Sequence, residues 1–198
     1  MDLQKLASTL LSSDAISGLS QRAGASASDV KNVLGSVLPS LLGGADNQAK
    51  GEDTAESFAA ALASHAKDGT ADLTGFLSNV DLEDGGKILS HLLGGEKEST
   101  TEAAAQKAGI SSAKTSTIMS AVAPLLLSLL GQQADEDDNK DSGVAGLMGA
   151  LLGNVDLGSL LGGLLGGEEE PAPVEEPKEE SSGGLGGLLS GLLGNLLK

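Results

Sequence analysis

The feature that most constrains the fold is an internal repeat. Residues 21–26, Gln-Arg-Ala-Gly-Ala-Ser, reappear at 106–111 as Gln-Lys-Ala-Gly-Ile-Ser, and the match continues without a gap to 41–42, which align with 126–127. Two copies are too few and too widely spaced for a solenoid. The repeat therefore predicts a duplicated small helical unit, with its copies at residues 16–49 and 101–134.

Each copy has the pattern of two helices joined by a tight turn. Gly24 and Gly109 stand where a helix ends in a left-handed residue, and Ser26 and Ser111 follow as N-caps. Asp29 completes an approximate capping box in the first copy only. The helix that follows each turn carries an apolar stripe at helical spacing. The stripes comprise Val30, Val33, Leu34, Val37, Leu38, Leu41 and Leu42 in the first copy, and Ile118, Met119, Val122, Leu125, Leu126, Leu129 and Leu130 in the second.

The rest of the pattern is also helical. Asp14 can cap the helix before the first turn, and Pro39 and Pro124 lie inside predicted helices, which they are expected to kink or break. No alternating strand pattern of useful length is present, so the predicted fold class is all-α. An N-terminal helix is predicted from four leucines, Leu3, Leu6, Leu10 and Leu11.

A second, shorter repeat lies outside the first. Residues 79–82, Asn-Val-Asp-Leu, recur at 154–157, and each occurrence is followed by a Leu-rich stretch that ends in Gly-Gly. This is a weaker sign of the same duplication.

Acidic runs divide the chain. It carries 12 Lys+Arg against 28 Asp+Glu, a formal net charge of −16, and much of the excess lies in two runs that are expected to stay solvated. The second run also contains three prolines, which favour an extended spacer. The predicted organisation is a helical body at 1–134, an acidic run and a Leu/Gly-rich segment at 135–167, a disordered Glu/Pro linker at 168–182 and a terminal piece at 183–198.

Composition excludes several classes of function. The chain has no Cys, Trp or Tyr, so it can form neither a disulfide framework nor a thiolate metal site, and it lacks an aromatic platform for single strands. No secretory leader is visible, and the least charged stretches are too rich in Gly for a convincing membrane span. We therefore expect a cytoplasmic protein.

Residues 19–34 are similar to a helix-turn-helix, which makes DNA binding the main alternative function. The outward face of its second helix offers Ser28, Asp29, Lys31 and Asn32, with one cation and one anion. A nucleic-acid partner is therefore disfavoured, because phosphate contacts supply most non-specific affinity.

Metal and catalytic patterns are incomplete. Asp135, Asp137 and Asn139 alternate as in a calcium loop, but Lys140 and Gly146 stand at the sixth and twelfth positions, where that loop has Gly and Glu. A still more degenerate version begins at Asp81, with Glu83 and Gly86.

Catalytic groups are sparse as well. His65 and His91 are the only histidines, and neither has a ligand-type partner four residues on. No G-x-S-x-G elbow occurs. We assign no catalytic, metal or cofactor-binding residue, expect no cofactor and no small-molecule substrate, and expect a protein that is not an enzyme.

The terminal piece is the most suggestive functional feature. Seven leucines form one helical stripe, and Gly and Ser dominate the opposite face. Since each Gly costs a helix about 1 kcal/mol relative to Ala, this helix should form only when its Leu face is buried. We predict a protein-interaction or self-assembly module that acts through Leu/Gly helix faces, and we rank binding to a membrane surface below a protein partner or self-association. The candidate interaction residues are Leu185, Leu188, Leu189, Leu192, Leu193, Leu196 and Leu197.

The body resembles the bacterial YidB-like proteins, a family with a domain of unknown function. The similarity rests on the opening Met-Asp-Leu, the Ala-Gly-x-Ser unit, residues 37–44, and residues 84–94, Asp-Gly-Gly-Lys-Ile-Leu-Ser-His-Leu-Leu-Gly. It implies a small helical fold with a homeodomain-like arrangement, and it brings no activity or cofactor. The long acidic and Leu/Gly tail departs from the family, so its role cannot be carried over.

Overall fold

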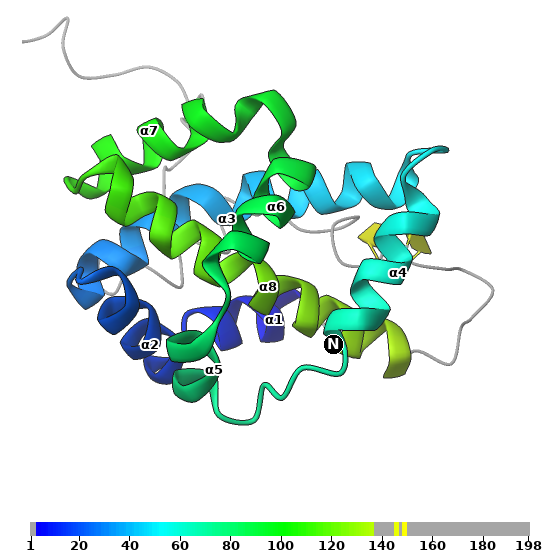
Figure 1. The fold of residues 1–198 in the computed structure, drawn as a ribbon, viewed down its shortest axis with the longest axis horizontal. Coiled ribbons are helices and arrows are strands. Elements are labelled where there is room, and N and C mark those ends of the chain that lie inside the picture. The colour runs from blue at the N-terminus through cyan, green and yellow to red at the C-terminus, as the bar shows by residue number, and fades with distance from the viewer. Residues whose placement is uncertain (1–2, 137–144, 147, 150–198) are drawn as a thin grey trace, which may run out of the picture. The chain divides into compact units, whose positions relative to one another are not determined.

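A computed structural model describes residues 3–136, 145–146 and 148–149. These residues lie in the first of two units, Met1–Gly167 and Glu168–Lys198. The described part contains eight α-helices, one short 3-10 helix and no strand, so the all-α prediction is confirmed. In chain order the helices are α1 (Leu3–Leu10), α2 (Ser13–Ala23), α3 (Ala27–Lys50), α4 (Ala55–His65), α5 (Leu73–Asn79), α6 (Leu82–Leu93), η1 (Gly94–Glu96), α7 (Lys97–Ala108) and α8 (Ser112–Glu136) (Figure 1).

Both copies of the repeat form the predicted pair of helices. Gly24 ends α2 with φ +60° and Gly109 ends α7 with φ +69°, a left-handed conformation that glycine adopts without steric cost. Ser26 Oγ accepts from the Asp29 amide at 3.1 Å, and the Ser26 amide donates to Asp29 Oδ2 at 3.0 Å, which confirms the capping box. In the second copy Ser111 Oγ accepts from the Lys114 amide at 3.3 Å.

The start of α2 differs from the prediction. Ser12, not Asp14, is its N-cap, and its hydroxyl accepts from the Ala15 amide at 3.2 Å. Asp14 lies in the first turn, where a carboxylate faces the positive end of the helix dipole.

Pro39 and Pro124 break neither helix. α3 and α8 each continue through their proline as one helix. Because proline has no N–H, the carbonyls of Gly35 and Ser120, four residues earlier, cannot receive the usual helical hydrogen bond. Each helix therefore contains one backbone carbonyl that receives no i to i+4 hydrogen bond from its own helix.

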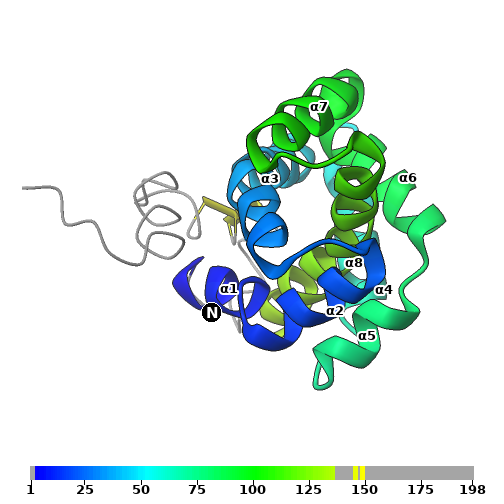
Figure 2. The ribbon, with the colours of Figure 1, turned by 90° about the vertical axis from the view of Figure 1, so that its left-hand side faces the viewer.

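The two helix pairs interlock. α2 packs on α8, and α3 packs on α7, so the first helix of each pair lies against the second helix of the other (Figures 1 and 2). The core between them is almost entirely aliphatic.

α8 is enclosed rather than amphipathic. All seven residues of the predicted stripe are buried, and the burial extends to every residue from Ile118 to Gly131, including Ser120 and Ser128. α8 is also long and apolar enough to cross a membrane by composition, but 78% of its apolar window is buried inside the structure, as expected of a central core helix.

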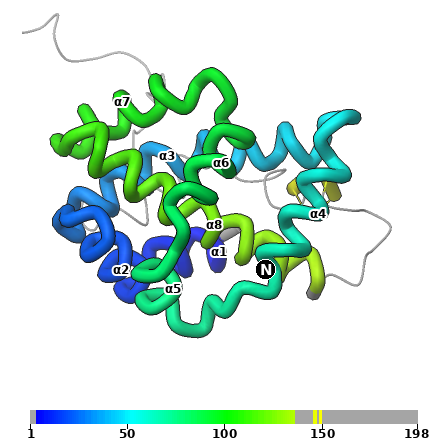
Figure 3. The backbone as a smooth tube through the Cα atoms, viewed as in Figure 1, coloured from blue at the N-terminus to red at the C-terminus, as the bar shows by residue number. Residues whose placement is uncertain are grey.

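The segment between the two copies supplies the other helices. Figure 3 traces the chain from the end of α3 through α4, α5 and α6 to α7. α4 and α6 pack on α8, and α5 packs on α2. These helices cover one side of the interlocked pairs.

Candidate functional site

The groove between α2 and α8 is filled by α5 and α6. Leu77 of α5 is fully buried against Gly18 of α2, where a Cβ would lie only 3.0 Å from the Leu77 Cβ. At one end Thr74 Oγ1 donates to the Asp14 carbonyl at 3.2 Å. Just beyond α5, Arg22 Nη2 donates to the carbonyl of Val80 at 3.1 Å.

α6 completes the filling. Gly85 meets the backbone of Ser120 so closely that a Cβ at Gly85 would overlap the Ser120 carbonyl. That carbonyl is the one that Pro124 leaves without its helical donor. Gly85 of α6 thus packs directly on the Ser120 carbonyl of α8, which is possible because glycine has no side chain.

The groove between α7 and α3 is the counterpart of the filled one, and no helix of the described residues fills it. It has a volume of ≈ 630 Å³. Each lining residue aligns, 85 positions away, with a residue of α2 or α8 in the first groove. The lining residues are Gly35, Ser36, Pro39 and Ser40 of α3, and Ser99, Thr100, Ala103, Ala104 and Lys107 of α7.

The correspondence includes the contacts that hold α5 and α6. Ala103 stands where Gly18 meets Leu77, and Lys107 stands where Arg22 binds the Val80 carbonyl. Gly35 stands where Ser120 meets Gly85, with Pro39 again four residues on.

The side chains that line the α3–α7 groove are smaller and more polar than their counterparts in α2 and α8. Ser40 replaces the fully buried Leu125, and Ala104 replaces the fully buried Leu19. Ser40, Ala103 and Lys107 are exposed. The α3–α7 groove therefore combines small side chains, hydroxyl groups and one cation, which allow a second helix to approach closely.

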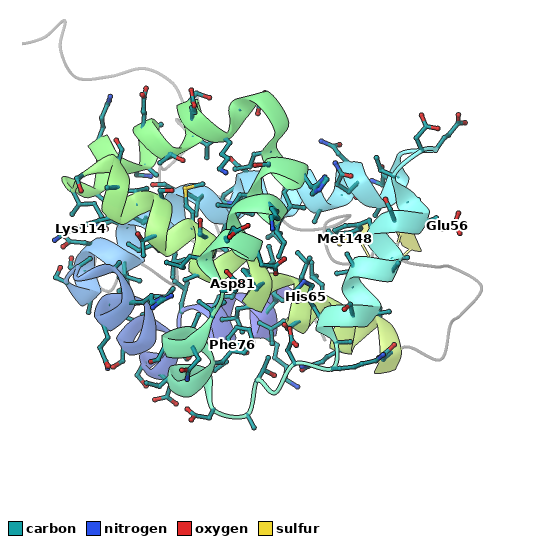
Figure 4. All side chains as sticks on the ribbon, viewed as in Figure 1. Glu56, His65, Phe76, Asp81, Lys114 and Met148 are labelled. Carbon is teal, nitrogen blue, oxygen red and sulfur yellow. The ribbon has the colours of Figure 1, made fainter. Side chains whose placement is uncertain are left out.

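A polar cluster surrounds His65 at the end of α4. His65 Nδ1 lies 2.9 Å from Asp68 Oδ2, and His65 Nε2 lies 3.8 Å from Asp84 Oδ2. In Figure 4 His65 lies on the side of α4 that faces the start of α6. Ser128 Oγ donates to Asp68 Oδ2 at 3.3 Å and to the Pro124 carbonyl at 2.9 Å. The serine hydroxyl is thus directed at the carboxylate and a carbonyl, and the cluster ties α4 and its following loop to α8.

His91 borders a small cavity of ≈ 160 Å³ between α3, α4, α6 and α8. Gln48 Nε2 donates to the His91 carbonyl at 2.8 Å, so this contact uses backbone rather than the ring. The other lining residues are Ser57, Phe58, Ala61, Ile88, Leu92 and Leu127, which are mainly apolar.

The predicted calcium-like patterns have other roles or fall outside the description. Asp81 is the N-cap of α6, and its Oδ1 accepts from the amides of Glu83 and Asp84 at 2.8 and 3.3 Å. Asp137 and Asn139 lie outside the described residues. Within the described part, no group of three or more His, Cys, Asp or Glu side chains could hold a metal ion.

The two helix-turn-helix-like segments differ in their surroundings. In α3 Ser28, Lys31 and Asn32 are exposed, as expected from the sequence. In α8 the first turn is exposed, but every residue from Ile118 to Gly131 is buried. The second copy therefore exposes fewer positions of its second helix than the first copy does.

Electrostatics at the start of α3 concern one carboxylate. The side chain and the backbone amide of Ser26 hold the pKa of Asp29 below its usual value, and Lys114 adds to the effect. Asp29 is only partly exposed but lies at the surface, so its ionised form stabilises the start of the helix rather than a buried site.

The seven predicted interaction leucines, from Leu185 to Leu197, lie outside the described residues. Sequence reasoning did not find the α3–α7 groove. The sequence contains one relevant sign, which is that both repeats occur twice. The structure shows that they are linked, because Arg22 of the longer repeat donates to the carbonyl of Val80 in the shorter one.

Comparison with known proteins places the chain in a family. No curated protein and no solved structure matches it. The family model described as a bacterial protein of unknown function (DUF937) matches residues 5–133, with which the resemblance to YidB-like proteins is consistent. This match covers both helix pairs and the segment between them, and the chain therefore belongs to the DUF937 family of bacterial proteins of unknown function.

Proposed function

We propose that this protein is a non-enzymatic interaction module that binds a Leu- and Gly-rich helical segment in the α3–α7 groove. The observation that carries the proposal is the filled counterpart between α2 and α8. Aligned residues line both grooves, so the same backbone geometry occurs twice. In one groove the fold supplies the helices, and among the described residues none fills the other.

The groove lining suits an occupant of this class. Ala103, Ala104 and Gly35 let a helix backbone come close, and each Leu that is fully buried would contribute about 1.5–3 kcal/mol. Ser36 Oγ donates to the Asn32 carbonyl at 2.9 Å, and burial of the Ser40 and Thr100 hydroxyls under an occupant would cost free energy, which reduces the gain on binding. These features favour reversible binding.

The arrangement of polar side chains supports a role without catalysis. In the described part of the chain, the hydroxyl of Ser128 contacts the His65 cluster through Asp68 and not through the imidazole. A nucleophile and its base need a direct hydrogen bond. The α3–α7 groove itself contains no carboxylate and no histidine.

The proposal can be tested with a single thiol, because the chain has no native cysteine. The full chain carrying Ala103→Cys would be labelled with an environment-sensitive fluorophore and titrated with a synthetic peptide of residues 73–93, the segment that fills the counterpart groove. We expect a saturable shift in emission. The same titration of Ser28→Cys, an exposed position of α3 outside the groove, should give no shift.

A second measurement is needed for the case in which the groove is already occupied and the added peptide cannot enter. The unlabelled thiol of Ala103→Cys should then react with a thiol reagent more slowly than that of Ser28→Cys, and denaturant should remove the difference. Equal reaction rates together with no response to the peptide would overturn the proposal.

A further inference from the structure

We infer that the groove's occupant is a segment of the same chain, residues 152–167, which contains the second Asn-Val-Asp-Leu motif. The inference rests on the proposed function and names the partner of that site. The segment would lie against α7 and α3 as α5 and α6 lie against α2 and α8.

The hydrogen bond between Arg22 and the Val80 carbonyl is the first support. Arg22 belongs to the longer repeat and Val80 to the shorter one. The counterpart of Arg22 is Lys107, which lines the α3–α7 groove, and the counterpart of Val80 is Val155. Both partners of the contact have therefore been duplicated, and Lys107 retains the ability to donate to a carbonyl.

The packing partners are duplicated as well. Leu77 lies two residues before Asn79 and packs on Gly18. Leu152 lies two residues before Asn154, and the counterpart of Gly18 is Ala103, which is still small. Asp81 caps α6. Asp156 is the equivalent residue of the second motif and would cap a helix if one began at Leu157.

The stretch after each motif has the same pattern of apolar pairs. Residues 88–95, Ile-Leu-Ser-His-Leu-Leu-Gly-Gly, match 160–167, Leu-Leu-Gly-Gly-Leu-Leu-Gly-Gly, although the second stretch begins three residues closer to its motif. Glycines at 158, 162 and 163 would let this helix approach the Gly35 carbonyl, which lacks its helical donor because of Pro39. Gly85 covers the Ser120 carbonyl in the same way.

The distribution of charge agrees with this occupant. Between residues 142 and 167 the only ionisable side chain is that of Asp156, and the only one lining the groove is that of Lys107. Met148 is fully buried in the same hydrophobic cluster as the body. The acidic run that begins at Glu168 favours solvent, so it is expected to lie outside the groove.

The decisive experiment uses paired cysteines in the full chain, which has none of its own. Ala103→Cys combined with Leu152→Cys should form an intrachain disulfide under mild oxidation, at a rate independent of protein concentration. Gly18→Cys with Leu77→Cys is the positive control from the filled groove. Ala103→Cys with Leu189→Cys tests the terminal leucine stripe as the competing occupant.

Three outcomes would overturn the inference. The pair with Leu189 could form faster, the disulfide could form only between two chains, or no disulfide could form. In the first two cases the thiol of Ala103→Cys would still be protected or the peptide would still bind, so the proposed function would survive with another occupant. Loss of both readouts would remove the proposed function too.

A release variant provides an independent readout. Leu152→Asp should expel the segment and raise the reactivity of the Ala103→Cys thiol by roughly tenfold or more, because local opening then requires little free energy. Leu189→Asp is the matched control and should leave that reactivity unchanged. If both variants act alike, residues 152–167 do not cover the groove.

Discussion

Asp29 and Lys114 stand at the same position in the two copies of the repeat, and the Lys114 ammonium donates to the carbonyl of Gly24 at 2.6 Å. Figure 4 shows Lys114 beside the turn between α2 and α3. The first turn of α8 is thus tied to the turn of the other copy. Opposite charges at equivalent positions allow these two helix starts to lie near each other without repulsion.

Asp29→Asn should lower the denaturation midpoint at neutral pH. The pKa of Asp29 in the folded protein lies below the usual value of 3.8, so its ionised form stabilises the fold above that pH, and the contribution is lost as the pH falls through the folded-state value. Urea denaturation at neutral pH and at a pH below 3.8 checks this. A difference between wild type and variant that stays constant across the two pH values would contradict the assignment.

Two adjacent glycines of α3 should respond in opposite directions to alanine. A Cβ at Gly44 would overlap the backbone carbonyl of Leu92, whereas a Cβ at Gly43 would meet no atom of the described residues within 4 Å. Gly44→Ala should therefore destabilise the fold by about 1–3 kcal/mol. Gly43→Ala should stabilise it by up to about 1 kcal/mol, because alanine favours the helix.

Chemical denaturation of the two variants gives the comparison directly. If Gly44→Ala is as stable as Gly43→Ala, then α3 and α6 do not approach as closely as the structure has them.

Two adjacent glutamines of α8 should also differ. Gln133 is 4% exposed, and in the described part of the chain its Oε1 has no hydrogen-bond partner. Gln133→Met should raise the free energy of unfolding by about 1 kcal/mol, because it removes a buried unpaired polar group. Gln132 accepts from Thr70 Oγ1 at 3.1 Å and donates to the Asp68 carbonyl at 3.2 Å.

The matched change, Gln132→Met, should lower the unfolding free energy by about 1–2 kcal/mol through the loss of both hydrogen bonds. Thermal and urea denaturation of the pair should agree in sign. Destabilisation by Gln133→Met comparable to that by Gln132→Met would show that the Gln133 oxygen is satisfied.

Leu77→Ala should weaken the filled groove. Leu77 is fully buried against Gly18, and truncation of a buried leucine costs about 2–5 kcal/mol. Ser78→Ala, at an exposed neighbouring position, should change stability by less than about 0.5 kcal/mol. Amide hydrogen exchange of α5 and α2 would show whether the loss is local. Equal stability of the two variants would mean that α5 does not anchor the groove.

Local sequence signals predicted local structure well. Gly24, Gly109 and the capping box of Ser26 and Asp29 each form as expected, because each depends only on residues a few positions apart. The N-cap of α2 was placed at Asp14 rather than Ser12, since both residue types can cap and spacing alone does not choose between them.

Burial around α8 could not be deduced from periodicity. Ala121, Ala123 and Leu127 lie outside the predicted stripe, and Ser120 and Ser128 resemble a polar face, yet all are buried. They are buried because α4 and α6, from another part of the chain, cover that side. The α3–α7 groove was missed for the same reason, because it consists of small residues from two helices that only the fold brings together.

α8 is enclosed by its neighbours, whereas no described residue covers the flank of α3 that lines the groove. Equivalent positions of these two helices are therefore expected to differ in how they tolerate substitution. A substitution between positions 118 and 131 is expected to change the stability of the fold, because every residue there is buried. A substitution at Ser36 or Ser40, which line the groove outside the core, is expected to change binding more than folding. The duplicated unit therefore occurs once with its second helix enclosed and once with part of that helix lining a groove.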